Sequence, residues 1–356
     1  QFDSIINKWH TCKNSGRINA SNPCVTGDTK VLTKEGRWLR IDSFLGQRKK
    51  ILVNEGIINE SEIEGSFRTG VKPVYILTTK SGYTLKLTAD HKVFTVNRGY
   101  IPACELTMDD YVLLPAYEVD EIKEVEDKTF YQMLGVYLGD GCGGKSEEIR
   151  SIQITMDSQK EMPILEKFAE YTAINYERIT HKNTPAMVQL TSTSGKYSIT
   201  NKLLINKFRE FVDLSLIADQ KRVSEKIFSL PLGEQKYVLQ GLFSADGTVA
   251  NYGEKSQYVA LDSTSLQLLK DVQILLLGFG IKSKLYTNRR AGKCVAFLPD
   301  GNGGMKEYKV KEMHSLRISK NNRIRFEKVL GFMPESYKSQ RLRIMNEKIG
   351  VYNEKP

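Results

Sequence analysis

Two stretches of eleven residues decide the fold of most of this chain, because they repeat one another. Residues 131–141 read Tyr-Gln-Met-Leu-Gly-Val-Tyr-Leu-Gly-Asp-Gly, and residues 237–247 read Tyr-Val-Leu-Gln-Gly-Leu-Phe-Ser-Ala-Asp-Gly. The stretches align without a gap, and each ends in an Asp-Gly pair that places Asp140 and Asp246 at matching positions. A repeat separated by this much chain predicts two copies of one structural unit, and so a pseudo-dimer within a single polypeptide.

Both stretches fit helices that pack closely against each other. Residues four apart share a helix face, and small residues at that spacing let two helix backbones approach. The small residues at this spacing are Gly135 and Gly139 in the first copy, and Gly241 and Ala245 in the second. We therefore expect two helices in contact, each ending at its aspartate.

Two carboxylates at adjacent helix C-termini need a positive partner, because a helix C-terminus already carries partial negative charge. A hard divalent cation, Mg²⁺ or Mn²⁺, suits such oxygen ligands. A single Asp-Gly helix end would be unremarkable, but a repeated one in a chain of net charge +10 favours a metal-dependent site for a polyanion. The basic excess concentrates between Gly278 and Met345, which hold 16 Lys and Arg against 5 Asp and Glu.

The paired segments resemble the two motifs of LAGLIDADG homing endonucleases, over residues 129–333. The resemblance implies an α+β fold in which an αββαββα unit occurs twice about a pseudo-twofold axis. It also implies cleavage of both strands of double-stranded DNA, with Asp140 and Asp246 as metal-binding and catalytic residues. A basic residue near the metal is implied in each half. Lys320 fits in the second half, and in the first half Lys202 is the closest match, although Asn201 aligns about as well.

The sequence of residues 24–117 predicts short strands and turns, unlike the helix-containing repeats of residues 129–333. Strand-like segments such as Val74–Thr78 and Tyr83–Leu87 are separated by turns such as Lys80-Ser-Gly82. Cys24 opens this region, and its thiolate could attack the carbonyl carbon of Pro23 to form a thioester. His91 could supply the proton for the leaving amine. Thr88, or the backbone of Asp90, could hydrogen-bond the scissile amide.

These residues resemble the first two sequence blocks of inteins, the protein-splicing elements of the Hint fold, over residues 24–115. The resemblance implies an all-β splicing domain that performs an N–S acyl shift at the Pro23–Cys24 junction without a cofactor. An inserted LAGLIDADG endonuclease is common in large inteins, so the two resemblances support each other. The expected multidomain order is a segment before the intein (1–23), the N-terminal part of a Hint domain (24–117), an acidic linker (118–128), the endonuclease (129–333) and a return segment (334–356).

The two ends of the sequence add expectations about partners. Residues 334–356 contain no His-Asn splicing block, so we expect a further C-terminal intein segment, in cis or in trans. Residues 1–23 resemble a loop of ribonucleotide reductases, which implies reductase exteins and a DNA target in the reductase gene without its intein. Five cysteines in no disulfide pattern favour a cytoplasmic protein, and no apolar run reaches the ~18 residues of a membrane span.

Two other classes of function stay open at this point. The chain could be a free-standing endonuclease or an RNA maturase in which the strand-rich region is an accessory binding domain. It could also be a non-catalytic DNA-binding regulator with a vestigial site. Cleavage of intein-less DNA in the presence of Mg²⁺, and thiol-induced release of residues 1–23, would distinguish these alternatives.

Overall fold

The computed structural model describes residues 24–47, 49–54, 58–63, 66–114, 124–143, 149–157, 159–176, 187–190, 194–253, 255–289, 292, 295–299 and 304–350. The chain divides into two compact units, Gln1–Tyr117 and Glu118–Pro356. Pro23, the segment 1–23 and part of the acidic linker 118–128 lie outside the described residues, as does the end of the return segment.

The first unit is built from antiparallel strand pairs. The pairs are β1 (Lys30–Leu32) with β2 (Trp38–Arg40), β3 (Lys49–Asn54) with β4 (Ile58–Ile63), β5 (Tyr75–Thr78) with β6 (Thr84–Leu87), and β7 (Lys92–Thr95) with β8 (Gly99–Pro102). Gly36 and Gly82 turn two of these hairpins with positive φ angles of 77° and 93°, a conformation that glycine adopts without strain. The all-β character expected for this region is confirmed.

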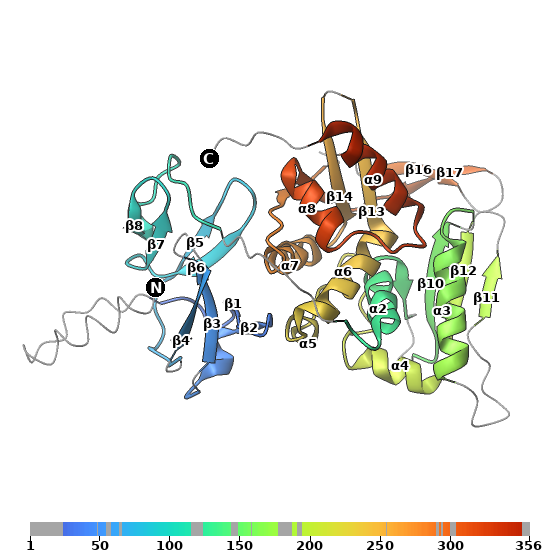
Figure 1. Ribbon diagram of the computed structural model, residues 1–356, viewed down its shortest axis with the longest axis horizontal. Coiled ribbons are helices and arrows are strands. Elements are labelled where there is room, and N and C mark those ends of the chain that lie inside the picture. Colours follow the sequence, from blue (N-terminus) through green and yellow to red (C-terminus); the bar gives the residue numbers. More distant parts are fainter. Residues whose placement is uncertain are drawn as a thin grey trace, which may run out of the picture. The chain divides into compact units, whose positions relative to one another are not determined.

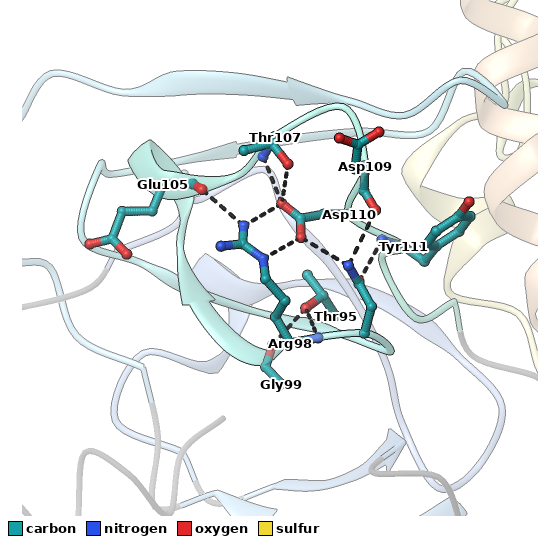
Figure 2. A network of polar contacts seen from close by, with 9 residues as sticks. Thr95, Arg98, Gly99, Glu105, Thr107, Asp109, Asp110 and Tyr111 are labelled. Carbon is teal, nitrogen blue, oxygen red and sulfur yellow. Dashed lines mark hydrogen bonds and ion pairs between the residues drawn. The ribbon is translucent and has the colours of Figure 1, made fainter.

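A polar network fixes the loop that follows β8. The Arg98 guanidinium donates to both carboxylate oxygens of Asp110 at 2.7 and 2.6 Å, and to the carbonyl oxygen of Glu105 at 3.1 Å (Figure 2). The backbone N–H of Thr107 donates to the same carboxylate at 2.6 Å. The Arg98 ion pair and these hydrogen bonds hold the pKa of Asp110 well below its usual value. This network ties the chain after β8 to the β7–β8 hairpin, which His91 immediately precedes.

The second unit contains two copies of the same order of elements. The first copy runs α2 (Lys128–Asp140), β9 (Gly141–Cys142), β10 (Ile152–Asp157), α3 (Met162–Asn175), β11 (Met187–Leu190), β12 (Ser194–Ile199) and α4 (Lys202–Arg209). The second runs α6 (Leu232–Asp246), β13 (Gly247–Asn251), β14 (Gln257–Ser263), α7 (Leu266–Leu277), β15 (Lys284–Tyr286), β18 (His314–Ser319) and α8 (Asn321–Val329). This arrangement confirms the repeated αββαββα fold.

The sheets of the two copies have matching strand orders, β11-β12-β10-β9 and β15-β18-β14-β13. The second copy adds a hairpin, β16 (Val295–Pro299) with β17 (Met305–Lys309). A short helix, α5 (Glu225–Phe228), precedes α6, and α9 (Tyr337–Ile349) follows the second copy within the same unit.

Helices α2 and α6 lie side by side at the centre of this unit, between the two sheets (Figure 1). A Cβ atom on Gly135 would lie 1.9 Å from the carbonyl oxygen of Val238, and one on Gly241 would lie 2.1 Å from that of Gln132. Only glycine permits backbones this close, because any side chain would overlap a partner backbone atom. The close approach brings the C-terminal ends of both helices to one place.

The described helices include none with the length and apolar character that a membrane span requires.

Candidate active sites

The carboxylates of Asp140 and Asp246 meet where α2 and α6 end. Each aspartate is the last residue of its helix, and a Cβ atom on Gly139 would lie 3.1 Å from Asp246 Oδ2. Both carboxyl groups are half-buried. Burial raises the pKa of Asp140 to about 7, with further contributions from the neighbouring charges of Asp246 and Glu161. Burial likewise raises the pKa of Asp246. The pair is therefore costly to ionise without a compensating positive charge.

Two buried lysines flank this pair, and each closes the end of one helix. Lys221 Nζ donates to the carbonyl oxygens of Tyr137, Gly139 and Gly141 at 3.0, 2.7 and 2.8 Å. Lys338 Nζ donates to those of Ser244 and Ala245, both at 2.6 Å. The positive charges of both lysines lower the pKa of each aspartate against the effect of burial. We call Asp140, Asp246, Lys221 and Lys338 the carboxylate site.

Sequence reasoning missed these two lysines. It named Lys202 and Lys320, but Lys202 begins α4 and Lys320 precedes α8, and both are exposed. Each buried lysine instead lies beyond the last helix of its copy, Lys221 after α4 and Lys338 in α9. A search for one lysine beyond the end of each repeat could have found both.

The donor set suits a hard divalent cation. Mg²⁺ in phosphate-processing sites is commonly held by one or two carboxylates, with water and substrate phosphate oxygens as the other ligands. In the described ranges, no group of three or more His, Cys, Asp or Glu forms a metal site made by the protein alone. Two carboxylates at neighbouring helix ends match the first pattern.

The sheet of the second copy adjoins the carboxylate site. Its face that points away from the helices carries cations and aromatic rings. Buried side chains such as Val259 and Leu316 point from this sheet toward the helices. On the opposite face, the Arg317 guanidinium lies between two rings, 4.3 Å from the centroid of Tyr258 and 4.7 Å from that of Tyr286. Asp262 lies on the same face of β14 as Tyr258, four residues further along the strand. The charge of Asp262 raises the pKa of Asp246. This face therefore combines positive charge and aromatic rings, which suits a polyanion.

Cys24 forms a second site in the first unit. Its backbone N–H donates to Thr88 Oγ1 at 3.0 Å, and the backbone N–H of Thr88 donates to the carbonyl oxygen of Cys24 at 2.9 Å. The Cys24 sulfur lies 3.2 Å from Thr69 Oγ1 and 3.6 Å from Lys72 Nζ. Sequence reasoning named Thr88 but not Thr69 or Lys72, which come from a loop with no motif of its own.

His91 lies close by in the chain, one turn after Thr88. Its backbone N–H donates to the Thr88 carbonyl oxygen at 3.1 Å, and its side chain is buried. The ring atom Nδ1 has no hydrogen-bond partner in the part of the chain that the structure describes, and burial lowers the pKa of the imidazole. This nitrogen is therefore available to a group that the described residues do not supply. We call Cys24, Thr69, Lys72, Thr88 and His91 the Cys24 site.

Comparisons with known proteins match both units. The LAGLIDADG-like domain family matches residues 234–331. The ribonucleoside-diphosphate reductase NrdEB subunit alpha of Bacillus subtilis is 27% identical over 345 residues, which cover 90% of this chain and 31% of the reductase. The replicative DNA helicase DnaB of Synechocystis sp. is 30% identical over 279 residues, covering 76% of this chain and 32% of the helicase. The crystal structure of a DnaB intein from Synechocystis sp. is 29% identical, with a TM-score of 0.25, over 26% of this chain and 70% of the intein.

The chain spans about a third of the length of the reductase and of the helicase. A reductase and a helicase have unrelated activities, so neither activity explains a stretch that both share with this chain. This pattern supports a splicing element over a free-standing endonuclease, a maturase or a regulator. These findings fit an intein region in which a Hint-type splicing domain is joined to a LAGLIDADG-type endonuclease domain.

Proposed function

We propose that Asp140 and Asp246 are the metal-binding and catalytic residues of a site-specific endonuclease. The observation that carries this proposal is the meeting of two carboxylates at the ends of packed helices, flanked by two buried lysines. Bound Mg²⁺ or Mn²⁺ would supply Lewis-acid stabilisation of the phosphate and an activated water. The aspartates would hold the cation, and the lysines would offset charge that develops on the scissile phosphates.

The DNA is bound, in this proposal, along the sheet face that carries Arg317. A guanidinium fixed between two aromatic rings loses little conformational freedom on binding and can contact phosphate or a base edge. The similarity to a reductase subunit supports a target in a ribonucleotide reductase gene that lacks the intein. Lys202 and Lys320 are exposed, which suits contacts to DNA better than contacts to the carboxylates.

We further propose that Cys24 carries out the first step of protein splicing. The Cys24 thiolate attacks the carbonyl carbon of Pro23, the C–N bond to Cys24 breaks, and the Cys24 amine takes up a proton to leave a thioester. Thr88 accepts a hydrogen bond from the scissile N–H, which orients the amide, and in this proposal His91 delivers the proton. Completion of splicing with a C-terminal intein segment is a further part of this proposal.

Two assays test these proposals separately. Purified protein with Mg²⁺ is expected to cut a duplex that carries the host coding sequence with the intein segment deleted, and chelation by EDTA should stop the reaction. A duplex with the intein segment in place is the control and should stay intact. Failure to cut the deleted sequence under all metal conditions would reject the endonuclease.

For splicing, excess thiol is expected to release the peptide 1–23, which mass spectrometry detects. The control is Cys24→Ala, which removes the sulfur and should abolish release. Equal release from this variant would show that another group is the nucleophile.

A further inference from the structure

The two lysines of the carboxylate site are equivalent by the repeat, but their surroundings differ in charge. The carbonyl oxygens of Gly139 and Ala245 occupy matching positions in the repeat, and they accept from Lys221 and Lys338 respectively. Both ammonium groups are buried, with residue exposures of 6% and 7%. The backbone carbonyl contacts are therefore nearly the same on the two sides.

The difference in charge comes from a residue of the first copy that contacts Lys338. Lys338 also forms an ion pair with Glu161, whose Oε1 lies 2.9 Å from Lys338 Nζ, and both side chains are almost fully buried. Glu161 is the residue before α3 in the first copy, and the matching residue before α7 in the second copy is Ser265. The Ser265 hydroxyl donates to the backbone carbonyl oxygen of Lys221 at 2.6 Å and brings no charge.

The two positions thus present unequal net charge to a substrate. Both ammonium groups are attracted by Asp140 and Asp246, but among the described residues only Lys338 has a further carboxylate in contact, that of Glu161. In a buried site a charge at about 3 Å is weakly screened, so the balance matters. The Glu161 charge also reaches Asp140, on which it acts against Lys338.

We propose that Glu161 is a positioning residue that acts through Lys338 and makes the two strands of the DNA target cut at unequal rates. The phosphate nearer Lys338 is cut more slowly, because a lysine paired with an additional carboxylate stabilises developing negative charge less than one without it. The protein therefore passes through a nicked intermediate. This inference rests on the proposed endonuclease.

The test uses a duplex of the intein-deleted host sequence, labelled on each strand in turn, with saturating Mg²⁺. Wild-type protein is expected to cut the two strands at rates that differ by about tenfold, the factor that corresponds to about 1.4 kcal/mol of transition-state stabilisation. Glu161→Gln keeps an oxygen acceptor for Lys338 but removes the charge, so the slower strand should accelerate and the ratio should approach one. Glu161→Asp keeps the charge and should keep the inequality.

The matched control is Glu166→Gln, which removes an exposed carboxylate from the same helix α3 and should leave the ratio unchanged. Lys338→Gln is an independent variant, expected to slow the slower strand by more than the faster one. Equal strand rates in the wild type would overturn the inference alone, as would a Glu161→Gln variant that changes both strands in proportion. A wild-type protein that cuts no DNA would overturn the endonuclease proposal and this inference together.

Discussion

The carboxylate site and the Cys24 site differ in how the fold holds their reactive groups. The aspartates end two helices whose backbones are in contact, and buried lysines close those helix ends. Cys24 is instead held by strand-end and loop residues, beside a stretch with large exposed apolar side chains such as Phe67 and Val71, 71% and 95% exposed. The first site is preorganised by packing, whereas the second depends on a few hydrogen bonds.

This difference predicts which substitutions each site tolerates. A site made by packing should lose function through charge or volume changes at buried positions. A site made by hydrogen bonds should lose function one contact at a time, with little effect on folding.

The largest effect is expected for Asp140→Asn or Asp246→Asn. Either change removes a metal-binding charge and should lower the rate of DNA cleavage by at least about 1,000-fold, the order of effect seen when a main electrostatic group is lost. Thiol-induced release of residues 1–23 should be unaffected. Cleavage is measured on the intein-deleted duplex, and a parallel loss of peptide release would contradict the independence of the two sites.

In the Cys24 site, His91→Ala should slow thiol-induced release by about 100-fold, a typical contribution of a positioned proton donor. Thr88→Val keeps the shape of the side chain and removes one hydrogen-bond acceptor, so a smaller loss of about tenfold is expected. Mass spectrometry gives the release rate, and circular dichroism should show an unchanged fold. A larger loss for Thr88→Val than for His91→Ala would reverse the roles assigned to these residues.

Packing of α2 against α6 is tested by Gly135→Ala. A Cβ atom there would overlap a backbone oxygen at 1.9 Å, which neither helix can avoid without separating, so we expect a loss of about 3 kcal/mol of stability. Gly139→Ala is the matched control, because its Cβ would meet the Ala245 Cβ at 2.9 Å, near the helix ends. Thermal unfolding should show a clearly larger fall in Tm for Gly135→Ala, and equal falls would refute close packing at Gly135.

The smallest effect concerns pH. Because the pKa of Asp140 is raised to about 7, the folded protein binds a proton that the unfolded chain releases near pH 4. This group therefore costs stability progressively as the pH rises from about 4 to about 7, and the full cost persists above pH 7. Mg²⁺ should offset that cost, so its stabilising effect on Tm should be larger at pH 8 than at pH 5.5. Asp140→Asn should remove most of the pH dependence of the Mg²⁺ effect, and an unchanged dependence would assign it elsewhere.

The repeat made much of the fold predictable from the sequence. Two aligned Asp-Gly stretches with small residues four apart specify two helices that can touch, and the αββαββα order follows from the resemblance they carry. The hairpin turn at Gly82 was predictable for a similar local reason, since its geometry depends on the residue in the turn itself. Thr88 was also readable, because it belongs to the same short motif as His91.

The partners of the reactive groups were not readable in this way. Lys221 and Lys338 lie far along the chain from the carbonyl oxygens that they bind, and neither stands in a motif. The ion pair joins Glu161 of the first copy to Lys338 in α9, far along the chain. No local sequence pattern therefore predicts it.

The sequence by itself determined the two chemistries, because paired carboxylates and a motif-bound cysteine are properties of residue type and order. Only the tertiary structure decided which lysines lie beside the carboxylates. It also decided that the charges around these lysines differ between the two copies. The physical reason is that charge interactions depend on distance and burial in space, which the chain order does not specify.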